Sequence, residues 1–206
     1  MSFARIPLFP LGLVLFPGQA VPLHIFEPRY RLMTRQCIEA RSPFGIVHVH
    51  DGEVAQTGCS AMIVKTLKEY EDGRSDILTL GQKAFRLMRT HADKAYFEAD
   101  IGYLDEDFSG MNPAVSEQIA KFYEQCHEVL YDEAPPPFET ESGVSLVYHV
   151  ASELPLDMTF RQTLLEMRSE AERQRRLVAR LTEWFPQLQK RDHVREKSAG
   201  NGHGAL

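Results

Sequence analysis

The spacing of hydrophobic and polar positions changes near residue 110 and divides the chain into two regions. Before this point, short apolar or alternating runs predict β-strands at 44–49, 59–67, 77–80, 85–88 and 96–104. Turn residues separate them, at Asp51-Gly52, Asp72-Gly73 and Gly81-Gln82. Asp72-Gly73 indicates a hairpin, because glycine tolerates the positive φ of tight turns. Strands of this length and spacing predict a small barrel or sandwich.

One helix interrupts this β region. Glu27-Pro28 is a favourable start, because proline suits the first helical turn and an acidic residue there favours the helix dipole. One face of the helix is apolar, at the spacing i, i+3, i+7, i+8: Tyr30, Met33, Cys37 and Ile38. We therefore expect Cys37 to be a packing residue, not a nucleophile. The other faces carry arginines that we interpret as solvated charge: Arg29, Arg31 and Arg35.

After residue 110 the pattern predicts helices. One begins at Asn112-Pro113 and ends near Tyr131, and a second covers 144–154. A third, kinked or divided, covers 157–184 and ends at Pro186; its apolar stripe, broken only by Gln174, is typical of a bundle core. Pro135-Pro136-Pro137 separates the first two helices. The sequence thus predicts an α+β chain with a β subdomain at 1–110, a helical subdomain at 111–189 and a disordered tail at 190–206.

Composition is that of a globular domain that can bury a core without disulfides, with 206 residues, 43% hydrophobic and 25% charged. The 23 basic and 29 acidic side chains give a net charge of −6, which weakens the case for nucleic-acid binding. Residues 98–157 alone carry one basic and 14 acidic side chains. This acidic segment either packs against the basic last helix or forms a face that repels nucleic acid and attracts basic partners.

The cysteines and the N-terminal segment indicate in which cellular compartment the protein is expected. The three cysteines are far apart in the sequence, without a CxxC pair, and predict neither a disulfide framework nor a thiolate metal site. No apolar run approaches the roughly 20 residues of a membrane span. Prolines and a glycine interrupt the apolar start at 6–16, so we expect a retained, folded segment and not a signal peptide. A cytoplasmic protein without a membrane partner is the expectation.

Motifs for catalysis are scarce. The chain contains no Gly-Lys dipeptide, which excludes a P-loop, and no GxSxG elbow. His127-Glu128 begins a zincin-like pattern, but Tyr131 stands where the second histidine ligand belongs. His48 and His50 would project from one face of a strand and could share a metal with a third ligand, for which we find no candidate. We predict no catalytic residue, no metal and no cofactor; on the residues alone, this is a binding protein.

The first 31 residues carry the most specific pattern in the chain. Residues 6–11 read Ile-Pro-Leu-Phe-Pro-Leu, residues 14–18 Val-Leu-Phe-Pro-Gly, and residues 22–31 Pro-Leu-His-Ile-Phe-Glu-Pro-Arg-Tyr-Arg. This order resembles the opening of the Lon protease N-terminal, substrate-binding domain. Weaker matches follow at 44–47, at Gly58, at 72–74, at Gly81, at 85–87 and at 154–166, so that the resemblance covers about residues 5–188.

The resemblance implies a PUA-like β-barrel followed by an α-helical bundle. In full Lon proteases such a domain recognises unfolded or tagged proteins and helps to assemble the ring, and ATPase and Ser-Lys protease domains follow it. This chain contains neither, so the resemblance implies a stand-alone, non-catalytic protein. The prolines of the opening motif are expected to be structural, confined to edge or turn positions, with Gly18 in a turn. Glu27 and Arg29 are expected to pair with barrel groups.

Three hypotheses for the function follow. The first is a recognition or adaptor module that binds peptides, unfolded proteins or partner proteins, with exposed apolar contacts around Phe26 and Tyr30. The second is RNA binding, because PUA-like barrels elsewhere bind RNA; the net charge argues against it. The third is a small metal-dependent hydrolase, which only His48 and His50 support.

Overall fold

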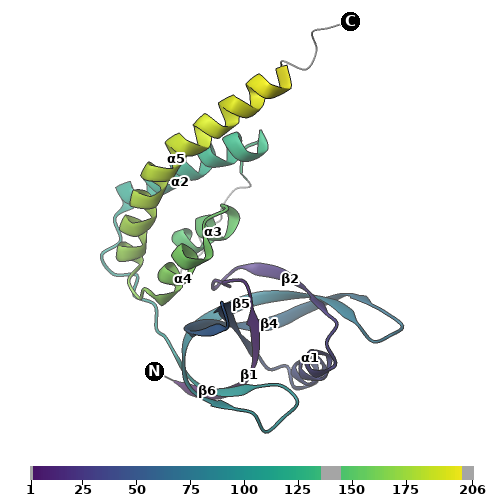
Figure 1. Cartoon of the computed structure of the whole chain (residues 1–206). Coiled ribbons are helices and arrows are strands. Elements are labelled where there is room, and N and C mark those ends of the chain that lie inside the picture. Colours follow the sequence, from purple (N-terminus) through teal and green to yellow (C-terminus); the bar gives the residue numbers. More distant parts are fainter. Residues whose placement is uncertain (1, 136–144, 201–206) are drawn as a thin grey trace, which may run out of the picture. The chain divides into compact units, whose positions relative to one another are not determined.

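The structure is a computed structural model that describes residues 2–135 and 145–200, the last ten as helix backbone. Along the described part of the chain, a region of strands with one helix between them comes first and four helices follow, which confirms the predicted α+β class (Figure 1). The chain forms two compact units. The barrel unit consists of Met1–Asp107 and Pro155–Arg168, and the helical unit of Phe108–Leu154 and Ser169–Leu206. The return of Pro155–Arg168 to the barrel unit was not expected from the sequence.

Five strands of the barrel unit close into a ring. The described part of the unit has six strands, all of which except β2 belong to the ring: β1 (Phe3–Leu11), β2 (Ala20–Ile25), β3 (Phe44–His50), β4 (Glu53–Glu69), β5 (Ser75–His91) and β6 (Glu98–Tyr103). Their order is β2-β5-β4-β3-β1-β6, and an additional pairing of β5 with β6 completes the ring. Strand β2 pairs with the first part of β5, outside the ring. All pairs are antiparallel except β1 with β3.

Strand β5 corrects one prediction. Residues 77–80 and 85–88 do not form two strands with a turn at Gly81-Gln82, because both lie in the single strand β5. The first part of β5 pairs with β2 and the second with β6, so tertiary pairing overrides the local turn signal. A β-carbon at Gly81 would overlap the carbonyl oxygen of Phe16. Gly81 is therefore required for a close approach between strand and backbone, not for a turn.

The hairpin turns are where the sequence placed them. Gly73 has a φ of +80°, and its backbone N–H donates to the carbonyl of Tyr70 at 2.8 Å. Asp51 and Gly52 both have positive φ, as a tight two-residue hairpin requires. Gly18 has a φ of +80° in the turn before β2. These turns set the registers of the strands that follow.

Two prolines lie within β1, although β1 is an interior strand of the ring. Residues 3–7 pair with β6 and residues 8–11 pair with β3, so each half of β1 has a strand on one side only. The N–H of Leu8 donates to the carbonyl of Phe97 at 2.8 Å, which directs the even-numbered residues of β1 toward β6. The backbone of Pro10 thus faces the β6 side, where pairing with β6 ends at residue 7. The backbone of Pro7 faces the β3 side, where pairing with β3 begins only at residue 8. Neither proline removes a ladder hydrogen bond.

Helix α1 (Pro28–Ala40) packs with a slightly different face than predicted. Tyr30, Met33 and Cys37 are buried as expected, but Ile38 is 47% exposed and Thr34 is buried in its place. Thr34 tolerates burial because its hydroxyl donates to the carbonyl of Tyr30 at 2.9 Å. Inside the ring, the core is formed by residues of β1, β3, β5 and β6: Ile6, Leu8, Val47, Phe85, Leu87, Ala99 and Ile101.

Three of the helices begin at side-chain caps. These are α2 (Pro113–Tyr131), α3 (Leu146–Glu153) and α4 (Met158–Glu166), whose first turns are capped by Asn112, Ser145 and Asp157. The third predicted helix is divided, into α4 and α5 (Glu170–Gly200). The prediction that Pro186 ends it is wrong: Pro186 lies inside α5, where a proline removes one helix hydrogen bond without ending the helix. None of the helices in the described ranges is both long and apolar enough to cross a membrane.

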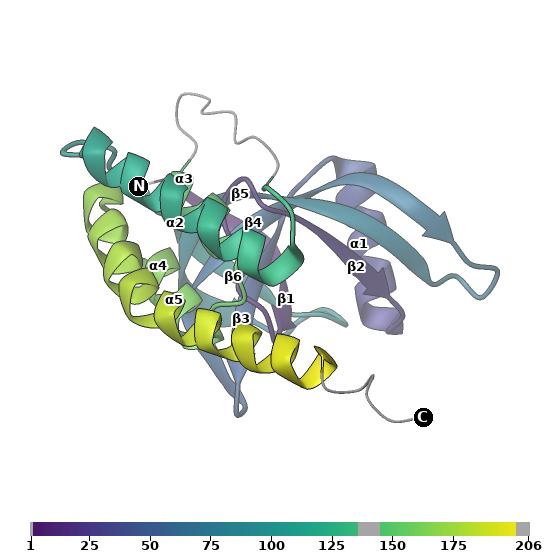
Figure 2. The same ribbon diagram turned by 90° about the horizontal axis from the view of Figure 1, so that it is seen from above.

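Two predictions fall partly outside the described residues. Pro136 and Pro137 of the proline run lie there, as do residues 201–206 of the predicted tail. Within the tail, α5 continues as far as Gly200. Helices α2 and α5 run side by side in the helical unit (Figure 2).

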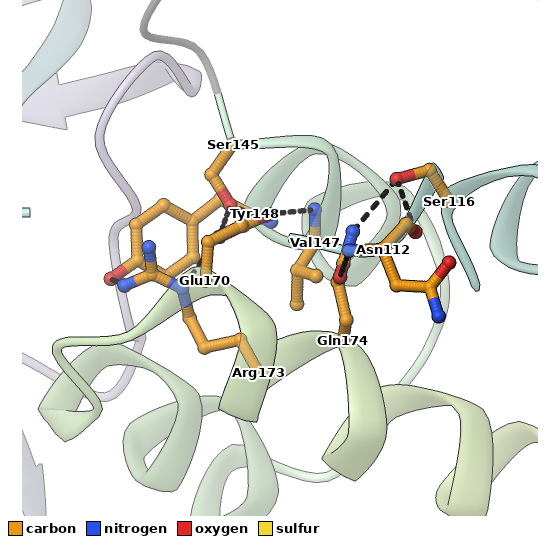
Figure 3. Close-up of polar contacts among 8 residues, drawn as sticks. All are labelled: Asn112, Ser116, Ser145, Val147, Tyr148, Glu170, Arg173 and Gln174. Carbon is orange, nitrogen blue, oxygen red and sulfur yellow. Dashed lines mark hydrogen bonds and ion pairs between the residues drawn. The ribbon is translucent and has the colours of Figure 1, made fainter. Parts of the chain in front are cut away.

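A buried polar network explains why Gln174 interrupts the apolar stripe of α5. The side chain of Gln174 donates to the hydroxyl of Ser116 at 2.7 Å and accepts from the backbone N–H of Asn112 at 3.3 Å, which ties α5 to the start of α2 (Figure 3). In the same way, Glu170 accepts from the Ser145 hydroxyl at 2.8 Å and from the N–H of Val147 at 3.4 Å, at the start of α3. The helical unit is therefore specified by polar contacts as well as by apolar packing.

Candidate functional site

A groove of about 520 Å³ in the barrel unit is bordered by β1, β2 and α1. We call it the β1–β2 groove. Its lining comes from the end of β1 (9–12), from residues 23–27 in and after β2, and from four further residues: Arg29, Tyr30, Val49 and Phe97. Most of these positions belong to the opening motif, so the segment that is most distinctive in sequence also forms the groove.

Alternation along β2 decides which side chains face outward. Leu23 and Ile25 are buried in the barrel unit, whereas His24 and Phe26 are exposed, Phe26 to 57%. Pro28 starts helix α1 directly after this segment, and the first turn of α1 brings Tyr30 under the groove. The groove therefore has an exposed aromatic side chain at its rim.

Tyr30 lies at the floor of the groove, not on its surface. Its side chain is only 6% exposed, its ring lies 4.1 Å from the ring of Phe9, and the guanidinium of Arg29 lies 4.6 Å above it. Burial raises the pKa of the Tyr30 hydroxyl. The structure thus places Phe26 and Tyr30 in one groove, but only Phe26 has the exposure that we expected of both.

Among the residues that the structure describes, Glu27 and Arg29 form no ion pair with another part of the barrel. They pair with each other, with the Arg29 Nε 2.8 Å from Glu27 Oε2. Sequence reasoning missed the groove residues Val49 and Phe97, of which Phe97 is 46% exposed. Val49 lies in β3 and Phe97 directly before β6, both distant in sequence from β2, and only the strand order could have located them.

A strip of aromatic side chains runs from the groove to the β4–β5 hairpin; this aromatic strip consists of Phe26, His24 and Tyr70. The rings of Phe26 and His24 stack with centroids 5.9 Å apart, and those of His24 and Tyr70 meet edge to face at 5.8 Å. Asp76 holds the strip in place, because His24 Nδ1 lies 2.5 Å from one of its oxygens and the Tyr70 hydroxyl donates to the other at 2.9 Å. These hydrogen bonds, that of His24 first, lower the pKa of Asp76.

The outer edge of β2 borders the same groove. Within the described residues, β2 pairs with β5 and with no other strand. The carbonyl of Val21 points toward β5, where it accepts from the Thr79 hydroxyl at 2.7 Å, so the backbone groups of Pro22 and His24 point to the outer edge. An edge of this kind can accept a further strand, and Pro22 limits that pairing to part of its length.

The histidines considered as metal ligands do not assemble a site. His48 and His50 lie side by side, with ring centroids 6.2 Å apart. His127 is buried and its Nδ1 lies 2.9 Å from the carbonyl of Glu133. Among the side chains of residues 2–135 and 145–190, no three of His, Cys, Asp or Glu lie close enough to hold a metal ion. The groove is therefore the principal candidate site.

Comparison with known families identifies the domain. The family described as the ATP-dependent protease La (LON) substrate-binding domain matches residues 5–183, a range that contains every residue of the groove. The chain belongs to this family. The resemblance in the opening motif is thus confirmed over nearly the whole chain.

Curated relatives of this Lon substrate-binding domain are larger proteins. Lon protease 2 of Herpetosiphon aurantiacus is 27% identical over 210 residues, which cover 94% of this chain and 25% of that protein. Lon protease of Parabacteroides distasonis is 26% identical over 190 residues, covering 84% of this chain and 23% of that protein. The chain thus spans about a quarter of the length of these relatives. Protein cereblon of Xenopus tropicalis is 31% identical over 99 residues, 45% of this chain and 22% of that protein.

Solved structures show the same fold. A Lon N-terminal domain protein from Xanthomonas campestris aligns with a TM-score of 0.66 at 24% identity, covering 85% of this chain and 98% of that one. The N-terminal domain of Mycobacterium avium complex Lon protease aligns with a TM-score of 0.62 at 13% identity, covering 87% and 98%. Both are Lon N-terminal domains, so the fold here is that of the family.

Proposed function

We propose that this Lon substrate-binding domain is a recognition module that binds peptide segments of other proteins in the β1–β2 groove, without a catalytic activity of its own. The observation that carries the proposal is the groove itself, which combines an exposed Phe26 with the outer edge of β2. The family match supports it, because the family is defined as substrate-binding.

The groove suits an extended peptide that carries an apolar side chain. Backbone groups of such a peptide can pair with those of His24 at the β2 edge, while an apolar side chain packs between Phe26 and the apolar residues at the end of β1. Fully burying a side chain as large as phenylalanine stabilises a complex by about 1.5–3 kcal/mol. Phe26 is therefore the residue whose truncation should affect binding most.

The test uses fluorescence anisotropy with labelled overlapping peptides from a reduced, unfolded protein. We expect a subset rich in apolar residues to bind, and Phe26→Ala to weaken their binding by about tenfold or more. Phe3→Ala is the matched control, because Phe3 is 68% exposed in the same unit and does not line the groove. Equal effects of the two substitutions, or no peptide binding by the folded protein, would contradict the proposal.

The proposed lack of catalytic activity is tested in a separate experiment. The purified protein is incubated with ATP and an unfolded substrate, and both ATP hydrolysis and cleavage products are measured. We expect neither, because the chain contains no Gly-Lys dipeptide for a P-loop. Cleavage that remains after repurification and is abolished by unfolding this protein would show that the non-catalytic assignment is wrong.

A further inference from the structure

A second, smaller pocket of the barrel unit lies between α1 and the β4–β5 hairpin and concentrates positive charge. Its volume is about 240 Å³, and three arginines line it: Arg31, Arg35 and Arg74. We call it the arginine pocket. Among its lining residues, Glu69 supplies the only carboxylate. This concentration is notable in a chain whose net charge is −6.

The fold brings these three residues together from two elements. Arg31 and Arg35 are one helical turn apart, so they share a face of α1. Arg74 follows Gly73 in the hairpin turn. A β-carbon at Gly73 would overlap the guanidinium of Arg31. Gly73 therefore both permits the turn and leaves space for Arg31 over it. The sequence, in which Arg31 and Arg35 were interpreted as solvated charge, gave no sign of this convergence.

Of the three arginines, only Arg74 forms an ion pair with a carboxylate in the described part of the chain. Asp72 is engaged by Arg74, with Nε to Oδ2 at 2.7 Å, and accepts from the backbone N–H of Arg74 at 3.1 Å. This backbone hydrogen bond is the main reason that the pKa of Asp72 is lowered, and the charges of Arg74 and Arg31 act in the same direction. In the part of the chain that the structure describes, neither Arg31 nor Arg35 forms an ion pair with a carboxylate.

We propose that the arginine pocket binds the side-chain carboxylates of an acidic segment in the peptide that occupies the β1–β2 groove. Guanidinium groups bind carboxylates through paired hydrogen bonds. The pocket is smaller than the roughly 300–1,000 Å³ of small-molecule sites, so it fits one or two carboxylates of a larger partner better than a nucleotide. Glu69 in the lining disfavours a doubly charged phosphate more than a single carboxylate.

The aromatic strip connects the two sites. Tyr70 lines the arginine pocket and contacts His24, which lines the groove together with Phe26. A peptide with its apolar residue at Phe26 can therefore continue along the strip to the arginines. This inference rests on the proposed function. It specifies the partner as a peptide in which acidic residues follow or precede an apolar residue.

The test compares two labelled peptides, Leu-Phe-Val-Gly-Glu-Glu-Glu-Glu and the same peptide with serines in place of the glutamates, each also in reversed order. Of the two orders of the glutamate peptide, we expect the one that binds more tightly to bind about tenfold more tightly than the serine peptide of the same order at low salt. The double variant Arg31→Gln/Arg35→Gln should remove this advantage. The matched control is Arg86→Gln/Arg89→Gln, which removes the same charge from exposed positions of β5 and should retain it.

The outcomes separate this inference from the proposed function. If the serine peptide binds in a Phe26-dependent way but glutamates add nothing, the arginine pocket is not an acidic-peptide site and the groove proposal stands. An equal loss in both double variants would show that only overall charge matters, which also overturns the inference. Displacement of the glutamate peptide by inorganic phosphate but not by unlabelled hexaglutamate would assign the pocket to phosphate instead. If neither peptide binds, both proposals fail.

Discussion

Glu170 and Arg173 form an ion pair in the interior of the helical unit, with Nε to Oε2 at 2.8 Å and side chains that are 1% and 0% exposed (Figure 3). Further hydrogen bonds support the pair, since Glu170 accepts from the Ser145 hydroxyl and Arg173 donates to the Tyr148 hydroxyl at 2.6 Å. The Ser145 hydroxyl also caps α3 by accepting from the N–H of Tyr148 at 3.0 Å. One buried pair thus joins the start of α5 to the start of α3.

Removal of one partner should therefore be costly. Glu170→Ala leaves the Arg173 charge buried without its carboxylate, and we expect it to lower the free energy of unfolding of the helical unit by about 3–5 kcal/mol. The measurement is urea unfolding followed by far-UV circular dichroism. Glu117→Ala is the control, because Glu117 pairs with Lys121 on the surface and should contribute less than about 1 kcal/mol. Similar stabilities of the two variants would show that the buried pair is dispensable.

Asp100 gives the barrel unit a predictable dependence on pH. The hydrogen bond from Arg5, at 2.8 Å, and then that from His91, at 2.8 Å, lower the pKa of Asp100 to about 2. Because an unfolded aspartate titrates near about 3.9, the ionised group stabilises the fold above that pH and loses its effect as the pH falls toward 2. Asp100→Asn should therefore destabilise the protein at neutral pH, and the difference from the natural protein should disappear in strong acid.

Thermal unfolding of both proteins from pH 7 to pH 2 checks this, together with the NMR titration of the Asp100 carboxyl. Asp51→Asn serves as the control, because the Asp51 side chain is 89% exposed. We expect that substitution to leave the stability nearly unchanged at every pH. A midpoint of the Asp100 titration near 4 would contradict the structural assignment.

The sequence predicted elements well where a local signal and the tertiary structure agree. Helix α2 starts at Pro113 as predicted, because Asn112 accepts from the N–H of Ala114 and proline suits the first turn. It failed where tertiary contacts override a local signal. Gly81 resembles a turn residue locally, but β5 continues past it, with a register shift against β4, because β2 and β6 pair with successive parts of β5.

The candidate site was predictable only in part, for the same reason. Phe26 and Tyr30 follow from the opening motif, yet the burial of Tyr30 in α1 depends on its packing against Phe9 of β1. Phe97 has no motif, and its place in the groove follows from the pairing of β6 with β1. Residues that meet across strands distant in sequence cannot be paired from one sequence alone.

The three cysteines should be inert in the folded protein. Cys37, Cys59 and Cys126 are at most 3% exposed, and burial raises the pKa of the Cys126 thiol to about 11 and also raises those of Cys37 and Cys59. Because the thiolate is the reactive form, we expect no reaction with a thiol reagent at pH 8 in the native state, and complete reaction in guanidinium chloride. One fast-reacting thiol in the native protein would mean that a cysteine is more accessible than this structure allows.

Gly58 is the position in the barrel where an added methyl group should cost most. A β-carbon there would lie 2.5 Å from the carbonyl oxygen of Ile46 and 2.7 Å from Phe85 Cζ, at the crossing of β3, β4 and β5. The carbonyl belongs to a paired strand and cannot move without breaking the sheet, so Gly58→Ala should destabilise the protein by about 1–3 kcal/mol.

Gly12→Ala separates this clash from the general effect of replacing a glycine, because no atom lies within 4 Å of a β-carbon at residue 12. Relief of the Phe85 contact by Phe85→Leu should recover only part of the loss in Gly58→Ala, since the Ile46 carbonyl remains in the way. Urea unfolding of the single and double variants measures both effects. Full recovery would locate the constraint in the Phe85 ring alone, whereas equal stabilities of Gly58→Ala and Gly12→Ala would show that the two strands can separate to admit the methyl group.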